Sequence, residues 1–178
     1  MSIFDLRLET GRLLLRPPCA EDFAAFAAFC ADPLPMRHLG GVQAPSVAWR
    51  SLATLTGSWH LLGYSMFSVI EKDSGRWVGR VGPWQPHGWP GPEVGWSIVA
   101  DRWGRGYAAE AARAAIDWAF DTLGWEQVIH TIAPDNSNSQ AVARKLGSQV
   151  LHATRLPPPH EVDVEVWGQS RQAWQARR

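Results

Sequence analysis

The sequence predicts one α/β (α+β) domain: a mixed, mostly antiparallel sheet with a central parallel strand pair and helices on both faces. A strand at 93–100, a long helix at 104–123 and a strand at 127–133 follow one another, and a long crossover helix of this kind joins parallel strands. Strand–turn–strand patterns on either side indicate antiparallel flanks. No linker or internal repeat divides residues 1–178, so a single domain is expected.

The first strand and the first two helices are predicted from local signals. Three successive leucines bounded by Gly and Pro indicate a strand at 12–16. Apolar residues then recur at helical spacing over 20–31, and an Asp-Pro pair ends that helix. A proline suited to the first helical turn opens a second helix over 45–62.

The rest of the sheet is predicted from hairpin and turn signals. Strand-like segments at 64–71 and 76–84 flank a Lys-Asp-Ser-Gly turn. Four prolines and two glycines make 83–92 a loop that leads into the central strand. The elements expected after the central unit are a short helix at 138–146, closed by a glycine, and strands at 150–155 and 162–168.

Composition argues against several function classes. The 17 basic and 17 acidic side chains give zero net charge, which argues against a nucleic-acid partner. No apolar run approaches the ~20 residues of a membrane-spanning helix, and the first residues do not resemble a signal peptide, so a cytoplasmic protein without a membrane partner is expected. Cys19 and Cys30 form no CxxC pair and the histidines show no ligand spacing, so no metal is expected.

A Gly-rich turn, WGRGYA at 103–108, opens the long helix. Gly104 and Gly106 allow the backbone to bend so that successive N–H groups point one way, and the helix N-terminus adds partial positive charge. Arg102 and Arg105 add full charges. A pyrophosphate suits such a turn, although a tight turn that binds nothing has the same local pattern. Neither the dinucleotide fingerprint GxGxxG nor the P-loop fits.

These residues resemble motif A of the GNAT N-acetyltransferases, (Gln/Arg)-x-x-Gly-x-(Gly/Ala) between a strand and a helix. Gly106 and Ala108 fill its last two fixed places and Trp103 stands where Gln or Arg is usual, while WGRGYAAEA is similar to the RimJ/RimL-type branch. PDNSNS at 134–139, followed by AVARKLG, resembles the family's Asn-x-x-Ser, helix, Lys-Leu-Gly segment. With ETGRLLLRPPCAEDF near the start, the resemblance covers about residues 8–170.

The resemblance implies the GNAT fold, in which the central parallel strands are splayed, and acetyl-CoA as the cofactor. The pantetheine arm would pair with the first of these strands near 98–100, and the pyrophosphate would lie on the N–H groups of 105–109. The acceptor would be a primary amine, either a protein or peptide N-terminus or a small-molecule amine, that attacks directly in a ternary complex. The residues expected to bind acetyl-CoA are Ile98, Val99, Ala100, Arg102, Gly104, Arg105, Gly106, Tyr107, Ala108, Asn136 and Ser139.

The resemblance also implies the catalytic residues. Glu93, at the start of the cofactor strand, is the expected base, directly or through a water, and a solvated carboxylate beside Pro92 is the alternative. Ser139 is the expected proton donor to the leaving thiolate, because Ala143 stands where many family members carry a Tyr. An ordinary serine in the first helical turn is the alternative. His87, in the loop before the cofactor strand, is a second candidate base.

Tryptophan is unusually frequent, with 11 residues, and four of them lie within 84–103. This cluster falls where acceptor and cofactor should meet, so we expect an aromatic acceptor pocket that favours an apolar or aromatic amine over a polycation. The residues expected to line it are Trp84, Trp89 and His87, with Trp49 or Trp59.

A non-catalytic acyl-CoA-binding module, acting as a sensor or scaffold, is the alternative function. It stays open because the family's Tyr is missing at Ala143 and because Trp103 replaces a polar residue in motif A. A homodimer is possible, and the sequence does not identify the acceptor amine.

Overall fold

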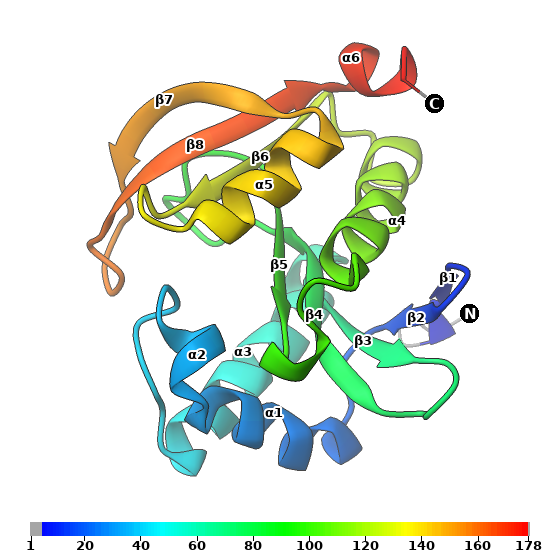
Figure 1. Cartoon of the computed structure of the whole chain (residues 1–178), viewed down its shortest axis with the longest axis vertical. Helices are drawn as coiled ribbons and strands as arrows, with labels where there is room; N and C mark the ends of the chain where they lie inside the picture. Colours follow the sequence, from blue (N-terminus) through cyan, green and yellow to red (C-terminus); the bar gives the residue numbers. More distant parts are fainter. Residues whose placement is uncertain (1–4, 178) are drawn as a thin grey trace.

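The computed structural model describes residues 5–177, whose strands form one eight-stranded sheet in the order β1-β2-β3-β4-β5-β6-β8-β7 (Figure 1). The strands are Leu8–Glu9 (β1), Leu13–Arg16 (β2), Phe67–Glu71 (β3), Trp77–Trp84 (β4), Glu93–Ile98 (β5), Gln127–Ile132 (β6), Gln149–Arg155 (β7) and Asp163–Ser170 (β8). The helices are Phe23–Ala31 (α1), Pro33–Met36 (α2), Pro45–Leu62 (α3), Tyr107–Asp121 (α4), Ser137–Leu146 (α5) and Arg171–Gln175 (α6).

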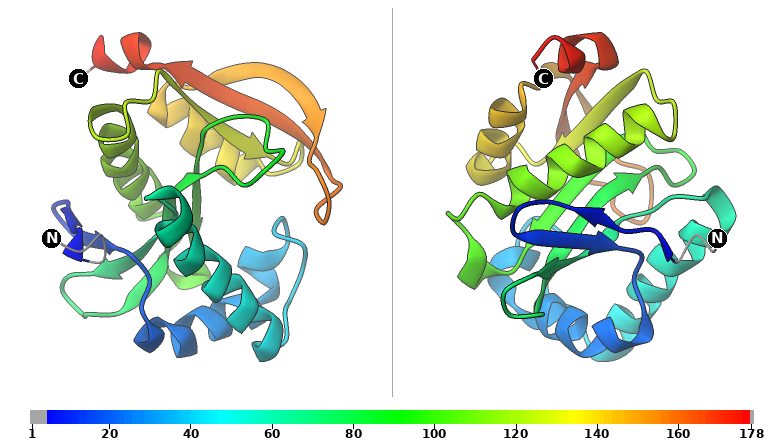
Figure 2. Two further views of the ribbon diagram at one scale, coloured as in Figure 1. Left: turned by 180° about the vertical axis from the view of Figure 1, so that it is seen from behind. Right: turned by 90° about the vertical axis from the view of Figure 1, so that its right-hand side faces the viewer.

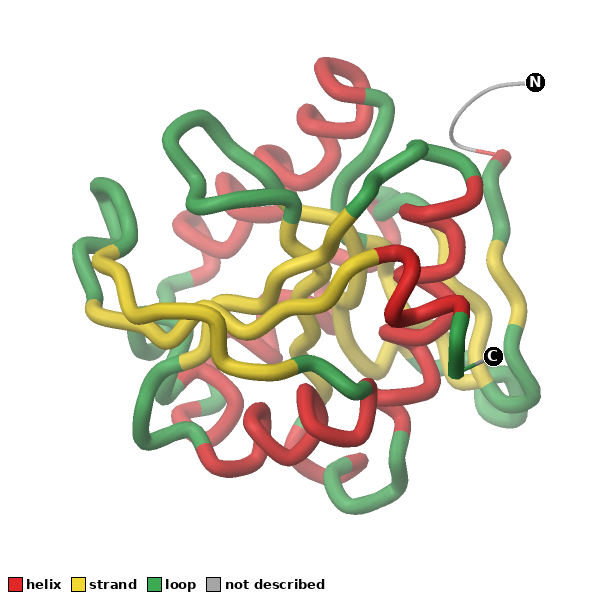
Figure 3. Tube along the Cα trace, turned by 90° about the horizontal axis from the view of Figure 1, so that it is seen from above, coloured by secondary structure: helices red, strands yellow, loops and turns green. Residues whose placement is uncertain are grey.

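The predicted fold class is confirmed. β5 and β6 are parallel and joined by the crossover helix α4, while the other neighbouring strands are antiparallel. Helices lie on both sides of the strands when the molecule is seen from above (Figure 3). In Figure 1, α1, α2 and α3 lie together at the lower end, and α5 accompanies β6, β7 and β8 at the upper end.

Two main hydrophobic clusters cover the two sides of the central strands. α4 lies across one face (Figure 2) and buries the predicted stripe of small and apolar residues against valines of β4 and β5. α1 and α3 bury aromatic and aliphatic side chains with Trp77 of β4, and Cys30 belongs to this second cluster as expected. Removing this apolar surface from water stabilises the sheet between its helices.

Several element boundaries differ from the prediction. The third strand begins only at Phe67, and β5 ends at Ile98 in a 3-10 turn over Ala100–Arg102. α4 begins at Tyr107 because the preceding Gly106 has a φ of 81°, a left-handed conformation that interrupts the helix. β1, α2 and α6 were not predicted, since elements of two to five residues carry too little periodicity.

Candidate active site

The parallel strands β5 and β6 separate soon after they meet. Their pairing consists of one register pair, Glu93 with Ile129, and the Ile129 N–H donates to the Pro92 carbonyl at 2.9 Å. The sheet ladder between these two strands does not continue past that pair. The predicted parallel pair is therefore splayed, and the gap opens toward the carboxyl end of β5.

Beyond this pair, the backbone of β5 faces the gap. In an antiparallel pair, the backbone groups of successive residues point alternately toward the partner strand and away from it. The Val99 N–H donates to a β4 carbonyl at 2.9 Å, so the backbone groups of Trp96 and Ile98 point away from β4. The Ile98 carbonyl accepts from the Trp103 indole N–H at 2.7 Å. The groups left to pair with an extended ligand are both backbone groups of Trp96 and the N–H of Ile98. They overlap the predicted pairing segment, residues 98–100, at Ile98 and extend it back to Trp96.

Glu93 is buried at the point where the strands diverge. Glu93 is only 5% exposed, so the alternative of a solvated carboxylate is excluded. Oε1 accepts hydrogen bonds from the Thr131 N–H at 3.0 Å and from its hydroxyl at 3.1 Å, and Oε2 accepts from the Trp89 indole N–H. The carboxylate is thus held between β6 and the Pro-rich loop.

The environment of Glu93 suits proton transfer near neutral pH. Burial raises the pKa of Glu93 to about 7, although the Thr131 and Trp89 hydrogen bonds and the charge of Arg80 favour its ionised form. A general base works best when its pKa lies near the working pH. Glu93 can therefore both accept and release a proton under ordinary conditions.

A buried polar network, which the sequence did not reveal, joins β5 to β6 beside this site. His130 Nδ1 lies 2.7 Å from the Val94 carbonyl, and since a carbonyl only accepts, Nδ1 carries the hydrogen. Nε2 then accepts from the Ser148 hydroxyl at 2.9 Å, and Gln169 donates to the same hydroxyl. Burial lowers the pKa of His130 to about 4, so the ring is neutral. Ser148 therefore joins His130 to Gln169 within this network.

The Gly-rich turn has the geometry predicted for an anion cradle. Gly104 and Gly106 have φ angles of 73° and 81°, which side chains rarely adopt. The Glu110 N–H donates to the Gly106 carbonyl at 3.0 Å, the first bond of α4. The N–H groups of residues 107–109 consequently lack partners within the helix and are free for an anion.

The side chains of Arg102 and Tyr107 both bind Glu71 of β3. The Arg102 guanidinium pairs with Glu71 at 3.0 Å and with Asp101 at 3.0 Å, and the Tyr107 hydroxyl donates to Glu71 at 2.6 Å. The Arg102 hydrogen bonds, with those from Ser74 and Tyr107, lower the pKa of Glu71 to about 2. Arg102 therefore fastens the glycine turn to β3, and its charge is already compensated by two carboxylates. Since the Tyr107 hydroxyl is bound to Glu71, the group that Tyr107 can offer to a phosphate is its backbone N–H.

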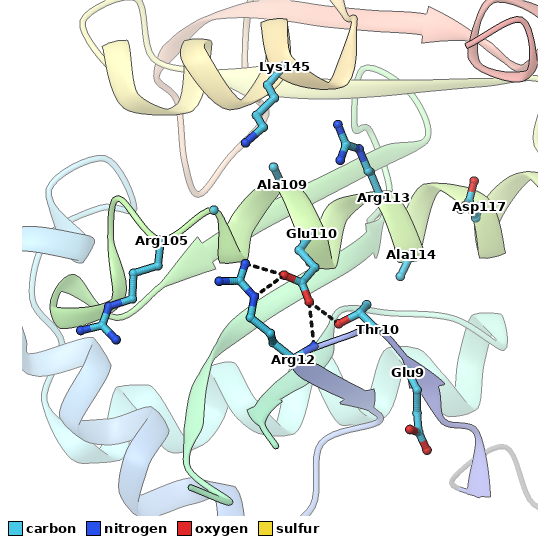
Figure 4. Close-up of a pocket in the computed structure, with 11 residues that line it drawn as sticks. Glu9, Thr10, Arg12, Arg105, Ala109, Glu110, Arg113, Ala114, Asp117 and Lys145 are labelled. Carbon is cyan, nitrogen blue, oxygen red and sulfur yellow. Dashed lines mark hydrogen bonds and ion pairs between the residues drawn. The ribbon is translucent and has the colours of Figure 1, made fainter. Parts of the chain in front are cut away.

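A pocket at the start of α4 supplies the positive charge instead (Figure 4). Arg105, Arg113 and Lys145 line it, and Lys145 of α5 and Arg113 of α4 reach into the space between their helices. Within residues 5–177, none of these three cations has a carboxylate at ion-pair distance. Glu110, in the same pocket, is already paired with Arg12 through Nε at 2.8 Å. Of these three cations, only Arg105 was predicted to bind the cofactor. Lys145 is the lysine of the Lys-Leu-Gly segment, which could have indicated it.

The first turn of α5 holds two further predicted residues. The Asn136 side chain caps the helix by accepting from the Ser139 N–H at 3.2 Å. Ala143 is fully buried in a small cluster that Trp96 of β5 packs against. Since residues four apart share a helix face, the half-buried Ser139 lies one turn from Ala143 on the side of α5 that faces β5.

The tryptophans expected to line the acceptor pocket occupy three environments. Trp84 is half-buried beside the cluster of α1 and α3, and Trp89 binds Glu93, so both lie near the carboxylate. Trp49 is 52% exposed and packs edge-on against an α1 phenylalanine. Trp59 is 1% exposed in the core, so it lines no pocket. His87 is an exposed residue of the Pro-rich loop.

The part of the chain that the structure describes contains no group of three or more His, Cys, Asp or Glu side chains placed to hold a metal ion. Along the same residues, no helix combines the length and apolar character needed to cross a bilayer.

The splayed strands, the glycine turn and the family comparison agree. Residues 12–149 match the model of the acetyltransferase (GNAT) domain, and the chain belongs to the GNAT N-acetyltransferase family. Protein YkkB of Bacillus subtilis (strain 168) is 30% identical over 79% of this chain and 84% of its own length. The structure of the acetyltransferase from Agrobacterium tumefaciens str. C58 has a TM-score of 0.83 at 31% identity, covering 93% of this chain and 95% of that one. Mycobacterium smegmatis RimJ in complex with CoA-disulfide shares the fold, with a TM-score of 0.71 at 20% identity over 94% of this chain and 87% of its own.

Proposed function

We propose that this single-domain protein transfers an acetyl group from acetyl-CoA to a primary amine by direct attack in a ternary complex. The observation that carries the proposal is the buried Glu93 carboxylate, with a pKa near 7, at the divergence of β5 and β6. A binding module gains nothing from a buried titratable carboxylate at this place, whereas an amine must lose a proton before or during acetyl transfer.

The groups of the site fit acetyl-CoA along its length. The backbone of Trp96 and Ile98 offers pairing groups to an amide-bearing arm, and the N–H groups of residues 107–109 suit a pyrophosphate. Arg105, Arg113 and Lys145 suit the remaining phosphate charge. The CoA compound bound by the RimJ neighbour, which shares the fold, supports the same ligand class here. When bound, acetyl-CoA supplies the activated acetyl thioester.

The residues around the gap have separable roles in this proposal. Glu93 takes the proton of the amine as the N–C bond forms and the C–S bond breaks. The Trp96 N–H, which lies nearer Glu93 along β5, stabilises the negative charge that develops on the acetyl oxygen, and the Trp96 carbonyl and the Ile98 N–H are left for the amide-bearing arm. Ser139, on the face of α5 toward β5, passes a proton to the departing thiolate and regains one from solvent, while Asn136 keeps the end of that helix in place.

The test is release of free thiol from acetyl-CoA with a panel of primary amines, together with equilibrium binding of acetyl-CoA. The proposal expects binding and amine-dependent thiol release. Binding without release for any amine would identify a non-catalytic acyl-CoA module. Absence of acetyl-CoA binding would rule out both functions.

Neutralising the basic pocket should weaken cofactor binding without changing the chemical step. Lys145→Gln and Arg113→Gln are each expected to raise the KM for acetyl-CoA about five- to thirtyfold with kcat nearly unchanged, since each removes one charged contact worth roughly 1–2 kcal/mol. The measurement is steady-state kinetics at two salt concentrations, and the wild-type KM should be the more salt-sensitive.

Arg144→Gln is the matched control for this prediction. Arg144 neighbours Lys145 on α5, is exposed, and lies over the Trp167 ring at 5.1 Å instead of lining the pocket. Equal KM changes in Arg144→Gln and Lys145→Gln would show a general charge effect and contradict a phosphate site in this pocket.

A further inference from the structure

Arg80 is a cation inside the sheet that has no counter-ion among the described residues. It lies in the middle of β4, with Ser68 of β3 and Ser97 of β5 as its cross-strand neighbours. Its Nε is buried and has no hydrogen-bond partner, and no carboxylate among residues 5–177 lies within 4.0 Å of the guanidinium. A half-buried cation with a buried, unpartnered Nε is costly unless something supplies the missing negative charge.

The side chains around Arg80 do not supply that charge. Its guanidinium carbon lies 5.8 Å from the centre of the Phe26 ring, and Cys30 of α1 is its other neighbour on this side. Asp22, the carboxylate that accepts from Ser68, is already held by Arg16 at 2.7 Å and 2.8 Å. Burial lowers the pKa of Arg80, which reflects this lack of compensation.

Arg80 and Glu93 share one face of the sheet. Across the β4–β5 ladder, Glu93 is paired with Trp84, and Ser97 is paired with Arg80. These two rows of paired residues are four residues apart along β5, which places the Cα atoms of Glu93 and Ser97 about 13 Å apart. The long Arg80 side chain spans part of this distance, and the two charges influence each other without touching. An acceptor could therefore reach both groups at once.

The surface between these two groups is apolar. Gly82 and Gly95 are paired between the rows. A Cβ atom at Gly95 would lie 2.7 Å from the Met66 methyl group and 3.5 Å from Glu93 Oε1, so the Met66 side chain covers this glycine and extends toward Glu93. Methionine adapts its shape readily. A short hydrocarbon segment suits this surface.

We propose that the acceptor is an amine that also carries a carboxylate: the amine faces Glu93, a hydrocarbon segment passes Met66, and the carboxylate binds the Arg80 guanidinium. This assignment rests on the proposed acetyl transfer and names its substrate class. A guanidinium matches a carboxylate with two parallel hydrogen bonds and would use the unpartnered Nε. The same positive charge repels polyamines and other polycations.

The experiment compares matched amines that differ only in the carboxylate. Amino acids with a terminal amine, from glycine to 6-aminohexanoate, are paired with the n-alkylamine that lacks the carboxylate, and phenylalanine is paired with 2-phenylethylamine. We expect at least one carboxylated member to have a kcat/KM roughly tenfold to a hundredfold above its partner, the range for a charged hydrogen-bonded contact. Arg80→Met should abolish the preference, so that kcat/KM becomes equal within each pair. Any effect of the lost charge on Glu93 acts on both members of a pair and cancels in their ratio.

Two further variants keep the result interpretable. Arg50→Gln, an exposed arginine of α3, should retain the preference. Arg80→Lys keeps the charge but not the planar fork, and should lose most of the preference even if Arg80→Met does not fold. Equal kcat/KM within every pair, or a preference that survives Arg80→Lys and Arg80→Met, would overturn the assignment.

Equilibrium binding separates failure of this inference from failure of the proposed function. N-acetyl derivatives of the same matched pairs are titrated by calorimetry into the protein saturated with CoA. If no amine releases thiol, the transfer proposal fails, but Arg80-dependent binding of the carboxylated derivatives would still establish a carboxylate site. Binding that ignores either the carboxylate or Arg80 would reject the site even in an active enzyme.

Discussion

Glu93→Gln is expected to lower kcat roughly ten- to hundredfold, because the variant keeps the shape of the side chain but cannot accept the amine proton. The ratio of wild-type to variant kcat/KM should rise with pH, with a midpoint near the pKa of Glu93, about 7, and level off above it. Using the ratio cancels the titration of the amine itself. The measurement is thiol release between pH 5.5 and 9.

Trp89→Phe tests whether Glu93 is the base by changing the pKa of its carboxyl group. The Trp89 indole N–H donates to Glu93 and favours its ionised form, so its removal should move the midpoint of the wild-type profile to higher pH. Glu126→Gln, at an exposed carboxylate that pairs with Arg171, should change neither kcat nor the profile. A ratio for Glu93→Gln that stays constant with pH would show that Glu93 is not the base.

The second large effect concerns stability between pH 4.5 and 6.5. The pKa of Glu93 is raised from 4.5 to about 7, so the folded protein keeps a proton that the unfolded chain loses, and stability falls as pH rises through this window. The pKa of His130 is lowered from 6.5 to about 4, so the unfolded chain takes up a proton that the folded protein refuses, and stability falls as pH decreases. The two contributions nearly cancel in the wild type.

Replacing either Glu93 or His130 should reveal the pH dependence of stability that the other one contributes. In Glu93→Gln, the free energy of unfolding should increase with pH by about 1.4 kcal/mol per pH unit across the window, since only His130 remains. His130→Asn, which keeps a donor for the Val94 carbonyl, should show the opposite slope. Chemical denaturation at several pH values measures both.

The double variant is the control for this pair of slopes and should again be nearly flat. Glu71, Asp22 and Glu110, whose pKa values are all lowered, add the same contribution at the acid end of the window to the wild type and to every variant, so it cancels when the slopes are compared. Identical slopes in the wild type and both single variants would contradict the burial-driven shifts of Glu93 and His130.

The parts of the fold that could be predicted are those with local signals. The small-residue stripe of α4, the glycine turn and the hairpin of β3 and β4 each rest on residues close together in the sequence. The end of β5 was placed two residues late, because the Trp103 indole and the 3-10 turn replace the strand pairing there. That replacement depends on tertiary contacts that no local pattern contains.

The site was less predictable because its key environments are made by distant segments. Glu93 was identified by position, but its burial depends on Thr131, which is 38 residues away in sequence. The His130 network unites β5, β6 and β8, and Arg80 looked like an ordinary strand residue. Arg102 was assigned to phosphate because its partner Glu71, 31 residues distant, could not be inferred.

The contacts of Glu71 affect how fast and how tightly a nucleotide-bearing ligand can bind. By joining Arg102, Tyr107 and Ser74 to β3, it fixes the glycine turn as part of the folding unit. The entropy of ordering that loop is then lost when the chain folds and not at each encounter with a ligand. A preorganised turn of this kind should bind without an induced-fit step, so its association rate should be set by diffusion and by electrostatic attraction to the basic pocket.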